Sequence, residues 1–212
     1  MKRFLFTIIA GLALAACSRS PESNFYVLNP LPAQKQQTKN HPDLRVGIEE
    51  INIPSYMTKQ QFIIHYSPHH VKLNEFQQWA GALDKNIQRV VETNLSTILP
   101  GAVVAYFPWG IQFKPNCQLR INISQFEVDS LGNTLLRATY IIYSGEVLRQ
   151  KRTIEYRKLA PLLTVDSFVT TMNDSLNHLT QDIAKSMTAF LGLSAAINPK
   201  RLTGDEGVID QS

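Results

Sequence analysis

Histidines, glutamates and cysteines are the side chains in this sequence whose spacing could support chemistry. His65, His69 and His70 form the one cluster that resembles a metal site. A zinc site needs three or four converging ligands, and adjacent histidines on an extended chain point in opposite directions. The neighbouring Glu49 and Glu50 likewise point to opposite faces of a strand, which disfavours an acid–base pair of carboxylates. The sequence therefore predicts no metal site and no cofactor.

Motifs typical of catalysis are absent from the sequence. It contains no Gly-x-Ser-x-Gly elbow, no Walker loop, no His-Glu-x-x-His helix and no Cys-x-x-Cys pair. A hydrolase or metalloenzyme would need a nucleophile, a base and a group that orients them. The sequence offers no such set, so we expect a protein that is not an enzyme.

Cys17 is the residue whose surroundings indicate a specific chemistry. Two basic residues precede an uncharged apolar run over residues 4–14, which is too short to cross a bilayer core of about 30 Å. The run ends in Leu14-Ala15-Ala16-Cys17, a pattern that resembles the bacterial lipobox. We therefore expect residues 1–16 to be a signal peptide and Cys17 to carry diacylglycerol and acyl chains after cleavage. The alternative is a soluble periplasmic protein in which Cys17 is incidental.

Ser18 bears on which of the two membranes holds such a lipoprotein. An Asp after the lipidated cysteine favours the inner membrane in bacterial lipoproteins, and Ser18 is not Asp. We expect anchoring at the periplasmic face of the outer membrane, with residues 17–24 as the lipidated cysteine and a short tether. Two or three acyl chains hold a protein stably on a bilayer, whereas a single acyl chain binds it only marginally.

Charge and the second cysteine exclude other classes of function. Removal of Lys2 and Arg3 with the leader reduces the net charge from +4 to +2, and the basic residues form no aromatic-interleaved stripe, so nucleic-acid binding is disfavoured.

Cys117 has no cysteine to pair with once Cys17 is lipidated. It is either a redox or intermolecular thiol or, as we favour, a small buried residue at the start of a strand.

Apolar periodicity predicts two amphipathic helices. The first begins with Asn74 as N-cap and Gln77 completing a capping box, and it ends at Pro100-Gly101. Trp79 lies on its apolar stripe and is assigned to the core. The second runs from Thr164 or Asp166 to Leu191, with Gly192 at its end.

Alternating segments predict the strands. Short strands are expected at 25–28, 44–53, 61–67, 71–73 and 103–107, with a bulge near residues 49–50 of the second. Residues 118–128, 134–143 and 147–156 predict a three-stranded meander whose last member, rich in basic residues, suits a sheet edge. Together these elements predict a two-layer α+β domain over residues 25–193, with two long helices on one face of a largely antiparallel mixed sheet and a polar, disordered tail over 194–212.

Several segments in this order resemble the ABC-type transport auxiliary lipoprotein family (the PqiC family). They are the opening Phe25 to Pro30, the stretch Ile51 to Ile64, the segment Gln78 to Leu83, its continuation Arg89 to Leu99, Pro108-Trp109 and the strand Leu119 to Phe126. Lys59 stands where the family usually has Arg, Thr58 replaces a common Asp, and Gly81-Ala82 replaces Glu-Pro. A bidentate contact made by that Arg is therefore not assumed here.

The resemblance implies a non-catalytic, outer-membrane-anchored subunit of an envelope-spanning lipid transport system, which works with a mammalian-cell-entry (MCE) domain protein and could form a homo-oligomer. Exposed residues of mixed character would then bind the partner: Tyr56, Met57 and Lys59, together with Trp109 as either a loop plug or an interface anchor. The alternative is a regulatory or pilotin-like lipoprotein for cell-wall synthesis or another envelope machine.

Overall fold

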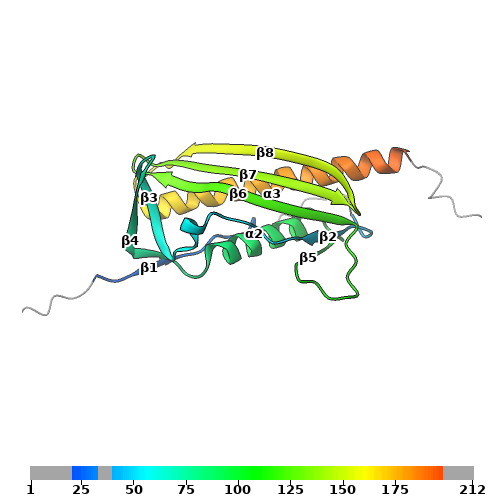
Figure 1. The fold of residues 1–212 in the computed structure, drawn as a ribbon, viewed down its shortest axis with the longest axis horizontal. Coiled ribbons are helices and arrows are strands. Elements are labelled where there is room, and N and C mark those ends of the chain that lie inside the picture. Colours follow the sequence, from blue (N-terminus) through cyan, green and yellow to red (C-terminus); the bar gives the residue numbers. More distant parts are fainter. Residues whose placement is uncertain (1–20, 33–39, 198–212) are drawn as a thin grey trace, which may run out of the picture.

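The computed structural model describes residues 21–32 and 40–197, where eight strands form one open sheet. In chain order the elements are β1 (Asn24–Tyr26), β2 (Arg45–Ile48), the 3-10 helix η1 (Ser55–Thr58), β3 (Gln61–Ser67), β4 (His70–Trp79), α2 (Leu83–Ile98), β5 (Val103–Tyr106), β6 (Cys117–Asp129), β7 (Asn133–Ser144), β8 (Val147–Leu159) and α3 (Val165–Ile197). Figure 1 shows α2 and α3 on one side of the long strands. The predicted two-layer α+β class is confirmed.

β6 is the strand on which the rest of the sheet is assembled. It pairs antiparallel with β7 along most of its length, and β7 pairs antiparallel with β8, which confirms the meander and its charged edge strand. On its other side β6 pairs in parallel with β2 near its start and with β3 near its end. The pair β2–β5 and the group β3–β4–β1 therefore lie at opposite ends of β6, which spans roughly 40 Å at about 3.3 Å per residue.

The core lies between this sheet and the two helices. Alternate residues of β6 are buried from Cys117 to Ile123, and a register shift between Ile123 and Gln125 moves the buried set to Phe126 and Val128. A bulge has this effect because one extra residue reverses the side-chain alternation. The predicted apolar stripes of both helices are buried in the same core: Leu83, Ile87, Val90, Val91 and Leu95 of α2, and Phe168, Val169, Met172, Leu176, Leu179, Ile183 and Met187 of α3.

The predicted start of the first helix at Asn74 is wrong. Residues 70–79 form β4, which pairs with β3 on one side and with β1 on the other, and α2 begins only at Leu83. Asn74 Oδ1 accepts a hydrogen bond from the backbone N–H of Phe76 within the strand, 3.3 Å away, so it caps no helix. Trp79 is buried as expected, but at the end of a strand.

Two further boundaries differ from the prediction. β2 stops at Ile48, and the chain returns to β6 through the single bridge between Asn52 and Asn122, so residues 44–53 are not one bulged strand. α3 continues to Ile197 past Gly192, which was expected to end it. A glycine inside a helix costs only about 1 kcal/mol, which neighbouring turns offset.

The segment 28–31 is held by polar side chains of both helices. Asn94 of α2 accepts a hydrogen bond from the backbone N–H of Leu31 through Oδ1 and donates one to Asn177 of α3 through Nδ2, each at 2.7 Å. Arg89 of α2 donates to the Leu28 carbonyl. The chain that follows β1 is thus tied to the helical layer before it reaches β2.

Candidate functional site

η1 places the two expected anchor residues of the 54–61 segment in different environments. Tyr56 is 38% exposed, but Met57 is only 4% exposed, so the expectation that Met57 is a surface residue is wrong. The three residues per turn of a 3-10 helix direct successive side chains about 120° apart, and only one of this pair faces solvent. Met57 lines a very small interior space with Phe62 and Trp79, while Lys59 is exposed.

Glu127 of β6 links η1 to β3. Its Oε2 accepts a hydrogen bond from the Tyr56 hydroxyl at 3.1 Å and lies 3.1 Å from His65 Nε2, while its Oε1 accepts from Gln125 Nε2 at 2.8 Å. Burial of Tyr56, the negative charge of Glu127 and the hydrogen bond between the two side chains raise the pKa of Tyr56 to about 12. Tyr56 is therefore a neutral donor at ordinary pH, and the group fastens η1 to the sheet. No sequence pattern indicated this role of Glu127, because Tyr56 and His65 lie far from it along the chain.

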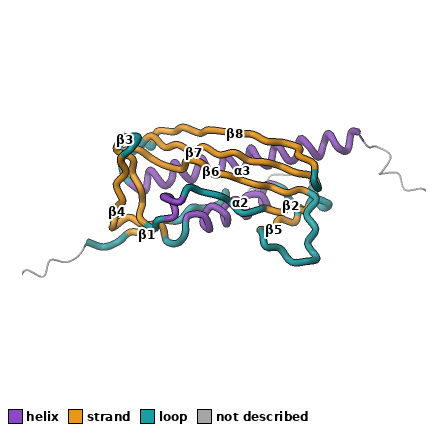
Figure 2. The backbone as a smooth tube through the Cα atoms, viewed as in Figure 1, coloured by secondary structure: helices purple, strands orange, loops and turns teal. Residues whose placement is uncertain are grey.

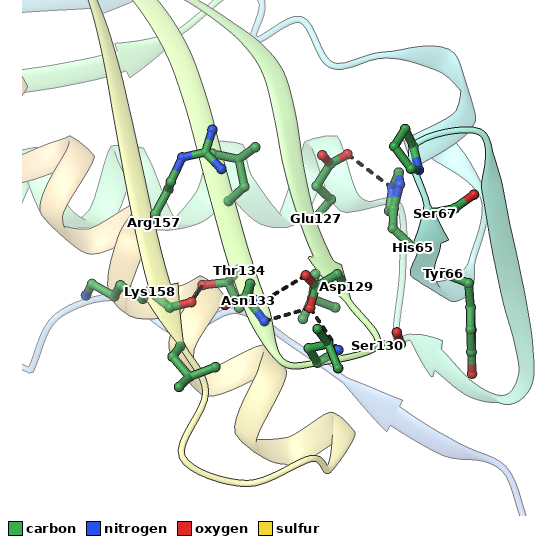
Figure 3. Close-up of a pocket in the computed structure, with 15 residues that line it drawn as sticks. His65, Tyr66, Ser67, Glu127, Asp129, Ser130, Asn133, Thr134, Arg157 and Lys158 are labelled. Atoms are coloured by element: carbon green, nitrogen blue, oxygen red, sulfur yellow. Dashed lines mark hydrogen bonds and ion pairs between the residues drawn. The ribbon is translucent and has the colours of Figure 1, made fainter.

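A surface hollow of about 650 Å³ opens beside this group, between the β3–β4 hairpin and the neighbouring ends of β6, β7 and β8. Figure 3 shows His65 and Glu127 near one another, Tyr66 on the outer side, and Arg157 and Lys158 across the hollow. Its acidic groups are already engaged by the protein.

Asp129 shows how the acidic groups of the hollow are used. It accepts hydrogen bonds from the N–H groups of Leu131 and Asn133 in the β6–β7 turn, in addition to the bond from the Asn133 side chain. The carboxylate therefore stabilises the turn.

The other sequence candidates for chemistry are separated. His69 lies in the exposed turn between β3 and β4 and the exposed His70 begins β4, whereas His65 faces Glu127. Over residues 21–32 and 40–197, no three His, Cys, Asp or Glu side chains lie close enough to hold a common metal ion. Glu49 forms an ion pair with Arg120, so it is not paired with Glu50 for acid–base chemistry.

Cys117 is buried at the start of β6, as expected. Burial raises the pKa of its thiol to about 11. The thiolate is the reactive form of a cysteine, so this residue has the properties of a core side chain rather than of a redox group.

Trp109 lies at the other end of the sheet from Tyr56, so the structure does not bring the two predicted anchors together. It belongs to the loop from residue 107 to 116 that joins β5 to β6, seen as the long teal loop at the lower right of Figure 2. Its ring packs edge-on against Phe107 and Phe113, with centroids 5.4 and 6.0 Å away. We call residues 107–116 the aromatic loop.

Ile111 in the aromatic loop is 98% exposed. Trp109 is half-buried and lies over Gly47 of β2, where an added Cβ would be 3.0 Å from its ring. Trp109 thus supports the loop, and Ile111 is the residue most available to a partner. Ile111 was not among the predicted residues, because a lone apolar residue in a loop belongs to no periodic pattern. Its position just after Trp109-Gly110 was the only available signal.

Cys17 and Ser18 lie outside the described residues, as do the predicted signal peptide over residues 1–16 and residues 198–212 of the predicted tail. Within the part of the chain that the structure covers, no helix has the length and apolarity needed to cross a membrane.

Known structures share this fold. A crystal structure of an uncharacterized protein superposes with a TM-score of 0.67 at 18% identity, covering 79% of this chain and 99% of that one. Protein XCC0632 from Xanthomonas campestris gives a TM-score of 0.61 at 13% identity, covering 82% and 97%. At these identities the likeness concerns the fold alone.

A family model identifies the family, and two sequence relatives agree with it. The intermembrane transport lipoprotein PqiC of Escherichia coli (strain K12) is 26% identical over 157 residues, which are 73% of this chain and 82% of that protein, and the PqiC of Shigella flexneri matches equally. The family model described as "ABC-type transport auxiliary lipoprotein component" matches residues 26–184, which include nearly every element from β1 to α3. The chain belongs to the ABC-type transport auxiliary lipoprotein family, as its sequence motifs indicated.

Proposed function

We propose that this protein is a non-catalytic docking subunit, anchored in the outer membrane through lipid on Cys17, of an envelope-spanning transport system that moves lipid and contains an MCE-domain protein. Family membership supports the role of an auxiliary transport lipoprotein. The two relatives named as intermembrane transport lipoproteins support the transport of material between membranes. The lipobox-like pattern and Ser18 support the anchor and its address.

The arrangement of the two ends of the molecule carries the docking proposal. The chain comes from the expected anchor into β1, at the left of Figure 1, whereas the aromatic loop lies at the right. An anchor at one end leaves the other end free to face the periplasm. There Ile111 is almost fully exposed on a loop supported by three packed aromatic rings, which is the kind of apolar contact point that protein partners use.

The test compares two exposed apolar residues in the full-length, lipidated protein. Ile111→Ser should weaken binding to the immobilised MCE-domain partner about tenfold or more, as expected for a central interface residue. Leu73→Ser, in β4 and 45% exposed, is the matched control and should bind as the parent does. Absence of parent binding in this assay would refute the docking function.

Two further variants locate the contact. Trp109→Ala should also weaken binding, because it removes the support for the loop that carries Ile111. Tyr56→Ala tests the second surface predicted from the sequence. If Tyr56→Ala lost binding while Ile111→Ser bound as the parent does, the docking surface would be at η1.

A further inference from the structure

Four exposed leucines gather at the end of the molecule that lies opposite the aromatic loop. Their side chains are between 64% and 69% exposed, and they come from the β6–β7 turn and from the end of β8 with the loop that follows it: Leu131, Leu159, Leu162 and Leu163. We call these four residues the leucine end.

The two segments are in direct contact, so the leucine end is one surface. The backbone N–H of Ala160 donates to the Gly132 carbonyl at 2.9 Å, and Asn133 is paired with Leu159 in the sheet. A side-chain carbon at Gly132 would lie 3.1 Å from Leu163 Cδ2. A single exposed leucine is ordinary, but a contiguous apolar group on the surface of a domain marks a contact surface.

The segments that carry the leucines are also held firmly. Asp129 accepts hydrogen bonds from backbone N–H groups inside the β6–β7 turn. In the first turn of α3, Ser167 Oγ accepts from the Leu162 N–H at 3.2 Å, and its own N–H donates to Thr164 Oγ1 at 3.3 Å. The apolar side chains are thus presented on a fixed backbone, with Phe168 buried in the core beside them.

The chain leading from the expected lipid anchor enters the domain beside this surface. Just after β1, the backbone N–H of Asn29 donates to Asn173 Oδ1 of α3 at 2.7 Å. Burial raises the pKa of Tyr26, and the charge of Asp166, in the first turn of α3, adds to this effect. Leu162 and Leu163 come shortly before that turn. Residues 17–24 extend to about 25 Å at most, which keeps the leucine end within reach of the bilayer that holds the lipid.

The charges around the leucine end suit a phospholipid surface. Lys158 precedes Leu159 and lines the adjoining hollow together with Tyr66 and Arg157, and the Arg157 guanidinium is paired with Glu155. Lys158 forms no ion pair with any acidic group of the described chain, and the neighbouring Asp129 is engaged by turn N–H groups. Leucines that enter the boundary between headgroups and acyl chains, with basic groups beside them at the phosphates, are the usual pattern of interfacial binding.

We propose that the leucine end lies in the headgroup–acyl boundary of the membrane that holds the lipid on Cys17. This inference rests on the proposed lipid anchor and deepens it: the acyl chains hold the protein, and the four leucines orient it. The aromatic loop then points away from the membrane.

The test places a polarity-sensitive fluorophore at each end of the full-length, lipidated protein in vesicles of phosphatidylethanolamine and phosphatidylglycerol. Leu162→Cys reports on the leucine end, and Ile111→Cys is the matched control at the opposite end. Cys117 is buried, and burial raises the pKa of its thiol to about 11, so the label goes to the introduced cysteine. We expect the fluorophore at residue 162 to show blue-shifted emission. We also expect spin-labelled acyl chains to quench it several times more strongly than they quench the fluorophore at residue 111.

Flotation of the vesicles separates failure of the anchor from failure of this inference. Protein that does not float with the vesicles refutes the lipid anchor itself. Protein that floats while residues 162 and 111 are equally exposed to water refutes only the leucine-end proposal. A third outcome is that the fluorophore at residue 162 is protected from iodide more strongly as the density of protein on the vesicles rises, while spin-labelled acyl chains do not quench it. That result would assign the surface to contact with a second copy of the chain and would also overturn the proposal.

Leu131→Cys repeats the measurement from the other segment and covers a failure of Leu162→Cys to fold. Leu131→Ser combined with Leu163→Ser should reduce the quenching at residue 162 while the thermal midpoint stays close to that of the parent. Unchanged quenching in this double variant would show that the four leucines do not hold the orientation, against the proposal.

Discussion

Tyr56 and Met57 are adjacent in sequence, yet their side chains have different roles. The Tyr56 hydroxyl fastens η1 to Glu127, and the Met57 thioether fills space beside Phe62 under the same turn. A segment that is turn-like in sequence therefore still contributes to the core. Substitutions in η1 test docking only where they leave Met57 in place.

Met57→Ala should lower the free energy of unfolding by about 2–4 kcal/mol, because a buried side chain is removed and a cavity is left. Lys59→Ala is the control, since Lys59 is exposed in the short connection between η1 and β3 and its loss should change this free energy by less than about 0.5 kcal/mol. Urea unfolding of the two variants measures the difference. Equal and small effects would mean that Met57 is not part of the core.

Cys117 provides a second test at the residue scale. Burial raises the pKa of its thiol from 9.0 to about 11, and the thiolate is the reactive form. Iodoacetamide at about pH 8 should therefore leave Cys117 unmodified in the folded protein and modify it fully in denaturant, as counted by mass spectrometry. Alkylation at the same rate in both states would contradict the buried position.

The same shift gives a pH dependence with a definite sign. The thiol ionises in the unfolded chain at its ordinary pKa but stays neutral in the folded protein until about pH 11. The unfolded state therefore loses its proton first, and the contribution of Cys117 to the free energy of unfolding decreases as pH rises from 9.0 towards 11. Urea unfolding across this pH window measures the decrease, which should be smaller in Cys117→Ala.

At the scale of elements, long-range pairing decides what local patterns leave open. Phe76, Trp79 and Leu83 are spaced as on a helix, but residues 70–79 pair with both β3 and β1. The helical spacing corresponds to a helix only from Leu83 onward. By contrast, the meander β6–β7–β8 and the stripe of α3 were predictable, because neighbouring hairpins and long amphipathic helices are specified by nearby residues.

The candidate site was predictable only in part for the same reason. Tyr56 and Trp109 were identifiable as residues of interest, but their positions at different ends of the sheet depend on the pairing of β6 with β3 and with β2. The four residues of the leucine end come from two segments that only the β7–β8 pairing brings together. Their clustering has no counterpart in the linear sequence.

Asn94 tests the connection between the helices and the segment 28–31. Asn94→Ala removes one partner of the Leu31 N–H and of Asn177, and leaving buried polar groups unpaired should lower the free energy of unfolding by about 1–3 kcal/mol. Hydrogen exchange at the Leu31 N–H should accelerate. Ser96→Ala, at an exposed position of the same helix, is the control and should leave that exchange unchanged.

At the scale of the whole molecule, the proposed anchor and the fold act together. Cys17→Ser removes the sulfur that would carry the lipid, so we expect an unprocessed or mislocalised protein, whereas the parent should fractionate with the outer membrane. Immunoblots of separated envelope fractions measure this. Recovery of the parent in the soluble periplasm would refute the anchor.

The length of α3 has a consequence for the geometry of transport. Its 33 residues span about 50 Å at 1.5 Å per residue, and its first turn lies beside the leucine end while the helix runs along the long axis of the molecule. With the leucine end on the bilayer, the domain would extend nearly that distance away from the membrane surface. A partner docked on the aromatic loop, as proposed, would then stop short of the membrane surface by a similar distance, and the last stretch of the proposed lipid path would run alongside this domain.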